Sequence, residues 1–546
     1  MENPDPRLLT ENGSRKQELF LLFAAFLVPL FLLGILRSIA GFEGGEPGTD
    51  AFYHVKMGLL GPGVFCAEKF PLLASSLWTD VFADKELSYH FLLGGVTYLR
   101  KFITGSTEGP FTFQTVFFCA LALGCFVKLL HSLKIPAPFI FLTSLLFPFC
   151  AASFTYRFLM LRPHVYSIAL LLLFCAIAAE KGLSRRGRLA AGLLMGFLYS
   201  WSYSNSHFLL IPAFLYSFFA WRESREKKEF FFLLVTAVGL LLGGILHPQF
   251  PNTFHIWKVQ GVDAMLGPLT GSGSASRLAP MEMQPGNLKW HLNNIPFYFL
   301  LYFILLMVCR LREKGKLDLA PAEKMIFSMG VIFSCGLFWA LRSVEMAAPF
   351  MMAAFAILLK KVFLLSLPLP LLPFAGVPLK RYLVLLLAVL LFILHSSLFI
   401  LGSAYRTKAP YTIAEFFRKN CSPNEVVCNM DWGDFPAMFF ASGMEIRQLW
   451  GMDPVFSYAK DRKLARELER TIINSIYIPG MDRRLHELTG SKFAFLLSHR
   501  KTFIRHLKRQ NWKVVFENEE GAVFALTPMQ NLIYPEPDPG RDQKRK

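Results

Sequence analysis

Long apolar runs separated by short polar loops fill the chain as far as about residue 407. A run of about 20 apolar residues is long enough for a helix to cross the hydrocarbon core of a bilayer. The expected spans are Leu19–Ile39, Phe113–Leu133, Phe139–Tyr156, Val165–Glu180, Leu189–Tyr203, Phe208–Trp221, Phe230–Leu246, Ile295–Cys309, Lys324–Leu341, Met346–Leu359 and Arg381–Leu401. The pattern therefore predicts a polytopic α-helical membrane protein with about 11 transmembrane helices.

The basic residues between the runs predict how the chain crosses the membrane. Arg7, Arg15 and Lys16 precede the first run, so the N-terminus is expected on the cytoplasmic side, where Lys and Arg accumulate. The same rule places later basic loops in the cytoplasm, namely Lys181–Arg188, Trp221–Lys228, Arg310–Lys316 and Lys360–Lys361. The first run lacks a small-residue cleavage site, which favours an uncleaved anchor. The C-terminus is then extracytoplasmic.

Two apolar pieces do not fit as full crossings. Tyr89–Phe102 is short, and a crossing there would move the later basic loops to the outer side. We expect an interfacial or re-entrant helix within the outer loop 41–112, with Arg100 and Lys101 at headgroup level. The Pro-rich piece 362–379 has basic residues on both sides, so it is expected to return to the cytoplasmic side.

The composition changes at about Lys408, where charge rises and the apolar runs shorten. Four short β-rich pieces and one helical stretch predict a soluble α/β domain over residues 408–534, after the transmembrane domain 1–407. The expected strands are Glu425–Asn429, Phe493–Leu497, Lys513–Glu517 and Ala522–Leu526, and the helix is Asp461–Ser475. Cys421 and Cys428 could pair outside the cytoplasm or remain free. The charged, Pro-rich tail 535–546 is expected to be disordered.

Composition and charge agree with a membrane protein and exclude nucleic acid as a partner. The chain of 546 residues is 53% hydrophobic, contains 56 Phe and has a net charge of +18. Much of this charge lies in short loops, where membrane orientation explains it, and no basic stretch is interleaved with stacking aromatics. Most of the nine Cys lie inside apolar runs, and no Cys/His spacing is typical of a metal site.

The stretch Gly48–His54 is the first candidate for chemistry. It follows the first apolar run and places Asp50 close to a Tyr-His pair at the expected outer membrane surface. A carboxylate in this position suits a general base that acts on a lipid-bound substrate. Thr-Asp before an apolar helix is also an ordinary helix start, so Asp50 as a helix cap is the competing interpretation.

The predicted orientation collects unusual polar residues at the outer ends of the spans. They are Asp50, His54, Asp80, Asp84, Glu86, His90, Arg157, Arg162, His164, Asn205, His207, His247, Arg342 and Glu345. Ionisable residues at a membrane are costly and tend to be functional, so their number predicts a cavity for an anionic lipid. Arg and His suit a phosphate or pyrophosphate, whereas carboxylates suit activation of a hydroxyl or a phosphate-bridging metal. The cofactor is left open: a divalent metal would fit, with Asp50 and Asp84 as candidate ligands.

Each of these residues also has a structural interpretation. Arg162 could snorkel to the interface from a loop, and Arg342 with Glu345 could form a local helix ion pair. His207 and His247 could be interfacial fillers, and Asp84 and Glu86 could be solvated loop charge.

Several motifs resemble those of the GT-C class of integral-membrane glycosyltransferases. Asp50-Ala51-Phe52-Tyr53-His54 is similar to the Asp-x-Tyr-Tyr-His stretch of oligosaccharyltransferase catalytic subunits. Three more stretches resemble sequences of bacterial GT-C-like proteins: Asp84–His90, Arg162–His164 and His247–Asn252. Asp431–Phe435 follows a predicted strand, as the Trp-Trp-Asp-Tyr-Gly acceptor motif does, but it departs from that motif, and the second-loop Asp-x-Asp is missing. Within the stretch Asp431–Phe435, Trp432 and Asp434 are the candidates for contact with the acceptor.

The resemblance implies transfer of a sugar from a polyprenyl-phosphate-linked donor to a lipid, glycan or protein acceptor, outside a bacterial inner or plasma membrane. Asp50 would be the general base of an inverting reaction. The substrate-binding candidates are His54, Asp84, Glu86, His90, Arg162, His164, His207, His247, Arg342 and Glu345. Arg162 and Arg342 would hold the lipid phosphate, and the Gly/Ser-rich loop Gly267–Ser276 would either gate the site or only connect spans.

Two other classes compete with this hypothesis. A non-catalytic or degenerate GT-C-like scaffold would tolerate single substitutions of the outer polar residues. A polytopic transporter or lipid flippase would place ionisable residues at the bilayer midplane and often contains internal repeats, whereas here the charges gather at the outer ends of the spans and no repeat is visible. The pattern therefore favours the transferase.

Overall fold

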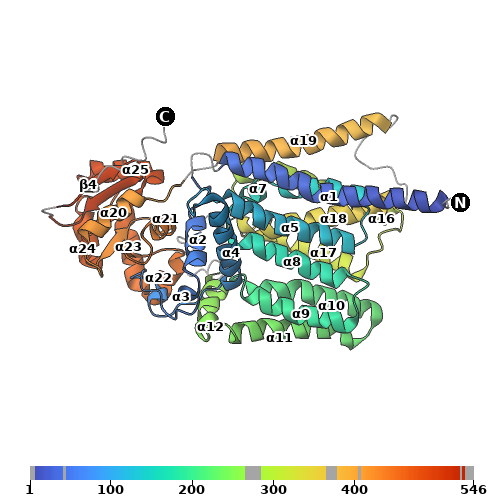
Figure 1. Ribbon diagram of the computed structural model, residues 1–546, viewed down its shortest axis with the longest axis horizontal. Coiled ribbons are helices and arrows are strands. Elements are labelled where there is room, and N and C mark those ends of the chain that lie inside the picture. The colour runs from blue at the N-terminus through green and yellow to red at the C-terminus, as the bar shows by residue number, and fades with distance from the viewer. Residues whose placement is uncertain are drawn as a thin grey trace. The chain divides into compact units, whose positions relative to one another are not determined.

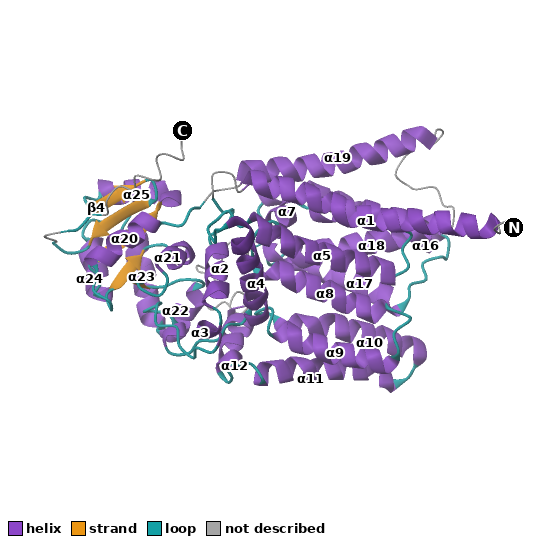
Figure 2. Ribbon diagram, viewed as in Figure 1, coloured by secondary structure: helices purple, strands orange, loops and turns teal. Residues whose placement is uncertain are grey.

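A computed structural model describes residues 6–40, 45–264, 285–364, 378–403, 407–528 and 532–534 of the protein (Figure 1). These residues are mostly helical and include one small sheet, drawn in orange in Figure 2. The chain forms two compact units. The helical unit comprises Met1–Phe42, Phe111–Leu246 and Ala279–Ala404, and the mixed unit comprises Glu43–Pro110, His247–Leu278 and Tyr405–Lys546.

The helical unit consists of apolar helices that pack side by side. In chain order they are α1 (Pro6–Ala40), α5 (Thr112–Ser132), α6 (Ala137–Leu146), η3 (Phe147–Phe149), α7 (Ala152–Phe158), α8 (Pro163–Ala179), α9 (Arg185–Ser200), η4 (Ser206–Leu209), α10 (Leu210–Ser224), η5 (Lys227–Phe230), α11 (Phe231–Ile245), α15 (Leu288–Asn293), α16 (Ile295–Glu313), α17 (Pro321–Gly336), η8 (Leu341–Ser343), α18 (Val344–Leu364) and α19 (Pro378–Ser403). Within this unit α5 packs along α8, α9 along α11 and α17 along α18 (Figure 1).

The apolar helices support an integral membrane protein, but they do not confirm the count of 11 spans. Among the described residues, five helices are long and apolar enough to cross a bilayer, or six if one bent pair forms a single span. Several predicted spans fold instead as shorter helices, such as α9 with 16 residues and α10 with 15. A helix of 15 residues is only about 22 Å long, which is less than the hydrocarbon thickness of about 30 Å.

The predicted span Phe139–Tyr156 is not one straight helix. The segment folds as α6, η3 and α7, and the two arms differ in direction by 85°. Pro148 lies in η3 and cannot donate the backbone hydrogen bond that would continue α6. Ala151 is extended, with φ −149° and ψ 129°, so the chain leaves the helical path before α7 begins. The break directs α7, which carries Arg157, away from the axis of α6.

The mixed unit combines the first loop with the C-terminal residues. Its elements are α2 (Asp50–Leu60), α3 (Pro62–Phe65), η2 (Leu77–Thr79), α4 (Leu87–Thr104), α12 (Asn252–Trp257), the π-helix η6 (Lys258–Asp263), α20 (Tyr411–Asn420), β1 (Val426–Asn429), η9 (Trp432–Asp434), α21 (Phe435–Ser442), β2 (Arg447–Gln448), α22 (Pro454–Lys460), α23 (Arg462–Asn474), α24 (Met481–Thr489), β3 (Phe493–Leu497), η10 (Ser498–Arg500), α25 (Lys501–Arg509), β4 (Lys513–Asn518) and β5 (Gly521–Ala525). The four predicted strands and the predicted helix are confirmed to within one or two residues.

The sheet has the strand order β2-β1-β3-β5-β4. Strands β2, β1 and β3 run parallel, whereas β5 is antiparallel to both β3 and β4. The first loop adds a further segment beside β2: the N–H of Gln448 donates to the carbonyl of Leu72 at 2.7 Å, and the N–H of Ala74 donates to the carbonyl of Gln448 at 2.9 Å. These bonds tie the first loop to the sheet.

A shared apolar core joins the first loop to the C-terminal residues of the mixed unit. Tyr53 of α2 and Trp78 of η2 are buried in one cluster with Phe435 and Phe439 of α21. The rings of Phe435 and Phe439 stack with centroids 5.4 Å apart, and Tyr53 packs 6.0 Å from Phe439. Burial of each large aromatic side chain contributes about 1.5–3 kcal/mol, so this core fixes α2 rigidly within its unit.

The predicted short helix Tyr89–Phe102 is confirmed as α4. Its buried face packs on α2, and its other face exposes large apolar side chains, including Phe91, Tyr98, Leu99, Phe102 and Ile103. An exposed apolar face of this kind suits an interfacial helix, which stays a prediction. All nine cysteines are free, so Cys421 and Cys428 do not pair. The loop 267–276, most of 362–379 and the tail 535–546 lie outside the described residues.

Candidate functional site

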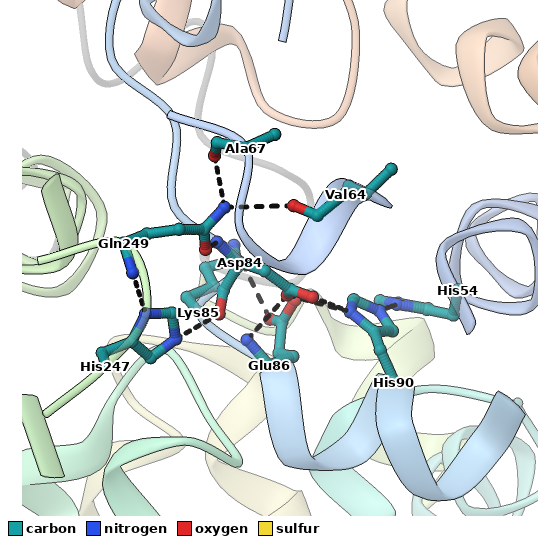
Figure 3. Close-up of polar contacts among 9 residues, drawn as sticks. All are labelled: His54, Val64, Ala67, Asp84, Lys85, Glu86, His90, His247 and Gln249. Atoms are coloured by element: carbon teal, nitrogen blue, oxygen red, sulfur yellow. Dashed lines mark hydrogen bonds and ion pairs between the residues drawn. The ribbon is translucent and has the colours of Figure 1, made fainter. Parts of the chain in front are cut away.

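Four side chains of the mixed unit form a buried acid–histidine cluster: His54, Asp84, Glu86 and His90 (Figure 3). The ring Nδ1 of His90 lies 2.8 and 2.7 Å from the two carboxylate oxygens of Asp84. Its Nε2 lies 2.8 Å from Nδ1 of His54. A carboxylate and two imidazoles therefore form a continuous chain of polar contacts in a site from which water is largely excluded.

The helices α2 and α4 position this cluster. His54 is one helical turn after Asp50 on α2, so both lie on one face of that helix. Glu86 occupies the N-cap position of α4, and His90 follows in the first turns. Oδ1 of Asp84 accepts the N–H of Glu86 at 3.1 Å, which directs the chain into α4.

Gly58 and Gly94 allow these two helices to approach closely. A Cβ built on Gly94 would lie 2.6 Å from the carbonyl oxygen of Gly58. A Cβ on Gly58 would lie 2.8 Å from the backbone nitrogen of Gly94. No side chain fits in either place, because the contacting atoms belong to the backbone. This close approach lets the short imidazole side chains of His54 and His90 meet.

The segment after α11 holds Asp84 through its backbone. Oε1 of Gln249 accepts the N–H of Asp84 at 2.6 Å, and Nε2 of Gln249 donates to the carbonyls of Val64 and Ala67 at 3.2 and 2.5 Å (Figure 3). Nδ1 of His247 accepts the N–H of Gln249 at 3.2 Å, so the ring proton sits on Nε2 and is donated to the carbonyl of Asp84 at 3.1 Å.

His247 therefore contacts the loop that carries the cluster, and both its ring nitrogens bond to the protein. Burial lowers the pKa of His247 below its usual value, which keeps the ring in the neutral form that these bonds require. Its predicted role in direct substrate binding stays a prediction. The observed contacts show a brace for Asp84.

Negative charge dominates the surroundings of the acid–histidine cluster. Burial raises the pKa of Tyr53 well above its usual value, and the carboxylates of Asp84, Glu86 and Asp50 raise it further. Lys85 brings one nearby positive charge, with Nζ 3.7 Å from Oε1 of Glu86. The cluster thus resembles a site for a cation or for transfer of a proton more than a site for a phosphate.

Asp50 is the first residue of α2, so Thr-Asp does begin a helix as the competing interpretation expects, although Asp50 itself lies one residue after the N-cap position. Thr49 occupies the N-cap position, and no side chain makes a capping hydrogen bond there. The side chain of Asp50 is only partly buried, unlike those of Tyr53 and His54 on the same helix. A carboxylate at this place is stabilised by the N-terminal end of the helix dipole.

Two groups within the described residues have the composition of a metal site. His54, Glu86 and His90 form the first, and Asp431, Asp434 and His499 form the second; in each group the ligand atoms lie within 4.8 Å of one another. Asp84 contacts the first group through His90. The suggestion that Asp50 and Asp84 bind a metal stays a prediction.

A second cluster lies in the helical unit and gathers Arg157, Arg162, Arg342, His164 and Glu345; we call it the arginine cluster. Nε of Arg157 forms an ion pair with the buried Glu345, and Nε of Arg342 lies 3.4 Å from Oε2 of the same carboxylate. The predicted local ion pair of Arg342 with Glu345 is therefore confirmed. Three guanidinium groups with a single carboxylate leave a net positive charge.

The break between α6 and α8 creates the arginine cluster. Arg162 is extended at the N-cap of α8, as expected for a residue before proline. Nε2 of the buried His164 donates to the carbonyl of Arg157 at 3.1 Å. Nδ1 of His164 is buried and finds no hydrogen-bond partner among the described residues. The cluster therefore brings the lone pair of His164 together with several guanidinium groups.

His207 lies in η4 of the helical unit. Its ring is half-buried and packs edge-on against Phe208, with centroids 5.0 Å apart. This arrangement agrees with an apolar filler, and its predicted role in substrate binding stays a prediction.

The acceptor-side candidates Trp432 and Asp434 lie in η9, directly after β1. Asp434 is fully buried, and its Oδ2 accepts the N–H of Leu497 at 3.1 Å. Its Oδ1 lies 3.3 Å from Nε2 of His499. The neighbouring Asp431 forms an ion pair with Arg500.

Sequence reasoning missed His499, although a signal was present. His499 follows β3, and Asp434 follows β1, the parallel neighbour of β3. The carboxyl ends of adjacent parallel strands meet at one edge of a sheet, which is where polar side chains of α/β domains converge. A prediction that the two strands are parallel neighbours would have placed the two residues together.

Asp434 predicts a pH dependence of stability. Burial raises its pKa well above the usual value, and the charge of Asp431 raises it further. The folded state then keeps the Asp434 proton above pH 4, where the unfolded chain has lost it, so this residue makes stability fall as the pH rises from about 4 toward the folded-state pKa. We expect the melting temperature of the Asp434→Asn variant to fall less between pH 5 and pH 8 than that of the wild type. The measurement is the melting temperature of each detergent-solubilised protein at the two pH values.

The partly exposed Asp482 of α24 supplies the control for this experiment. Asp482→Asn should show the same fall in melting temperature between the two pH values as the wild type. An equal fall in the Asp434→Asn variant would show that Asp434 is ionised in the folded state.

No protein family and no curated protein matches the sequence. Solved structures match the fold of this chain. The oligosaccharyltransferase AglB from Archaeoglobus fulgidus superposes with a TM-score of 0.59 at 12% identity, covering 94% of this chain and 74% of AglB. ArnT from Cupriavidus metallidurans gives 0.55 at 12% identity, covering 94% of this chain and 98% of ArnT. The arabinofuranosyltransferase AftD from Mycobacteria gives 0.51 at 10% identity, covering 93% and 40%.

The chain has the GT-C fold. The likeness predicted from short motifs is thus confirmed at the level of the fold, across nearly the whole chain. The AglB structure contains an inhibitory peptide and a dolichol-phosphate, and ArnT has also been solved with undecaprenyl phosphate. The apolar helices of this chain fit a membrane protein.

Proposed function

We propose that this protein is a GT-C membrane glycosyltransferase that transfers a sugar from a polyprenyl-phosphate-linked donor to an acceptor on the outer side of the membrane. The observation that carries the proposal is the GT-C fold over 94% of the chain, combined with a partly exposed carboxylate at the start of α2. Fold alone does not give an activity. The chemistry of the two clusters supplies the further argument.

Asp50 is our candidate for the general base. It would take the proton of an acceptor hydroxyl or amide as that group attacks the anomeric carbon. The new glycosidic bond forms as the bond from the anomeric carbon to the phosphate oxygen breaks, and attack from the opposite face inverts the configuration. A positioned carboxylate base contributes about 10²–10⁴-fold to such a step.

The arginine cluster is our candidate for the lipid phosphate. A guanidinium presents several N–H donors in a fixed plane and matches a phosphate in a bidentate manner. Glu345 engages Arg157 and Arg342 and so fixes their side chains before a ligand arrives. The positive groups would stabilise the charge that develops on the departing polyprenyl phosphate.

The test of this assignment is a charge removal at Arg162. We expect Arg162→Ala to raise the KM for the lipid-linked donor by about 10–100-fold, because a hydrogen bond to a charged group contributes about 1.5–3 kcal/mol. The measurement is transfer of a radiolabelled sugar by membranes that contain equal amounts of each protein. The donor is identified by a separate comparison of the source strain with a strain that lacks the gene. Mass spectrometry of the envelope glycans and polyprenyl-linked sugars shows which molecules differ between them.

Arg186→Ala is the matched control, since Arg186 is an exposed arginine of α9 in the same unit. Its KM should equal that of the wild type. An unchanged KM in Arg162→Ala would remove Arg162 from the phosphate site. Glycan profiles that do not depend on the gene would argue against the transferase, and flux of a lipid-linked sugar without a covalent product would identify a flippase.

A further inference from the structure

We propose that His54, Glu86 and His90 bind one divalent transition-metal ion, with zinc best matched to the ligand set, and that Asp84 orients His90 toward it. The assignment concerns metal binding by the mixed unit and does not depend on sugar transfer. It differs from the Asp50 and Asp84 pair that the sequence suggested, because Asp50 takes no part and Asp84 acts from behind His90.

The positions of the three side chains fit a single ion. One ligand atom from each of His54, Glu86 and His90 lies within 4.8 Å of the other two, and all three residues are buried. The two facing ring nitrogens are 2.8 Å apart. Two imidazoles on a tetrahedral zinc, each about 2.0–2.1 Å from the metal, hold their nitrogens about 3.3 Å apart, so a movement of about half an ångström admits the ion.

The protonation of His90 also fits a ligand. Both carboxylate oxygens of Asp84 lie within 2.8 Å of Nδ1 of His90, so this nitrogen carries the proton and donates it. The lone pair of a neutral ring is then on Nε2, which faces His54 and the Glu86 carboxylate. A carboxylate behind a metal-bound histidine is the usual outer partner that fixes the tautomer and raises the basicity of the ring.

Charge balance favours a cation at this place. The side chains of Asp84 and Glu86 are only 1% and 7% exposed, and Lys85 contributes one ammonium beside Glu86. Buried carboxylates are costly unless they are paired or coordinate a metal. A dication between Glu86 and the two histidines would interact favourably with the buried Glu86 carboxylate without requiring a buried imidazolium.

The ligand types select the class of metal. Two imidazoles and one carboxylate are the protein ligands of many zinc sites, and they leave one of the four positions for water or for an oxygen of a bound molecule. Magnesium and calcium prefer oxygen ligands alone, so the two histidines argue against them. The site is therefore expected to prefer zinc over magnesium.

The test measures metal directly on the full chain, purified in detergent. After treatment with EDTA and equilibration with zinc, elemental mass spectrometry should find about one zinc ion per chain in the wild type. His54→Gln and Glu86→Gln should lose most of it. His255→Gln is the control, because His255 is an exposed histidine of α12 in the same unit. Asp84→Asn should bind zinc about 10–100-fold more weakly, as expected for loss of an outer partner.

A second measurement covers variants that do not fold. Zinc should raise the melting temperature of the wild-type protein, and EDTA should reverse the change, since an ion that binds only the folded state stabilises it. Absence of zinc from the wild type, or equal zinc in the wild type and in both ligand variants, would overturn the proposal. The Asp84–His90–His54 chain would then be a hydrogen-bonded network, and the proposed transferase activity would stand or fall on its own tests.

Discussion

Asp50→Asn should abolish sugar transfer while the protein still folds and accumulates. An amide cannot accept the acceptor proton, so the rate should fall by about 10²–10⁴-fold, which is the usual contribution of a positioned carboxylate base. The side chain is partly exposed, so its replacement should change stability little. The measurement is the turnover of lipid-linked donor at saturating substrate, together with the profile of envelope glycans in a complemented deletion strain.

Asp80→Asn is the matched control for this prediction. Asp80 is an exposed aspartate of the same first loop, and its carboxylate lies 3.1 Å from Nζ of Lys460. A surface ion pair of this kind contributes little, so the variant should transfer sugar as the wild type does. A wild-type turnover in Asp50→Asn, with both proteins present in equal amounts, would refute Asp50 as the base. If Asp50 is the base, the lipid-linked sugar donor should accumulate in the deletion strain that carries Asp50→Asn.

Gly94→Ala should destabilise the mixed unit strongly. The new methyl group would lie 2.6 Å from the carbonyl oxygen of Gly58, and backbone atoms of α2 cannot yield as a flexible side chain can. Such overpacking costs about 1–3 kcal/mol or more and would separate α2 from α4. We expect a melting temperature lower by several degrees, as about 1 kcal/mol shifts a domain by roughly 4–8 °C, and weaker zinc binding as His54 and His90 move apart.

For the neighbouring residue Gly95 we expect the opposite change in stability. A Cβ on Gly95 meets no atom within 4 Å, and the residue is exposed in the middle of α4. Gly95→Ala should therefore stabilise the protein by about 0.5–1 kcal/mol, because alanine favours the helix more than glycine does. Equal melting temperatures for Gly94→Ala and Gly95→Ala would show that the two helices do not approach as closely as this structure has them.

The sequence determined the class of the protein and much of its local structure. Long apolar runs require helices in a membrane, and the β-rich pieces after Lys408 became β1, β3, β4 and β5 because alternating and buried strand patterns are local signals. The missed strand β2 has only two residues and exists because Gln448 pairs with the first loop. Such a strand has too few residues to show a period of its own.

The sequence also pointed to the residues that carry charge, since a buried ionisable group needs a partner and is therefore informative wherever it occurs. Asp50, Asp84 and Arg162 were named from their types and positions alone. Their partners could not be named in the same way. A pattern along the chain says which face of a helix a residue occupies, but it does not say which other helix that face meets.

Tertiary structure decided how these residues are grouped. His54 and His90 meet because two glycines allow α2 and α4 to touch, and Glu345 meets Arg157 because the break near Pro148 redirects α7. Both arrangements depend on contacts between residues far apart in the chain, where packing of a few specific atoms outweighs local preference. The sequence by itself therefore determined what kind of protein this is and which residues are costly to bury, and only the packing of the helices decided which of them act together.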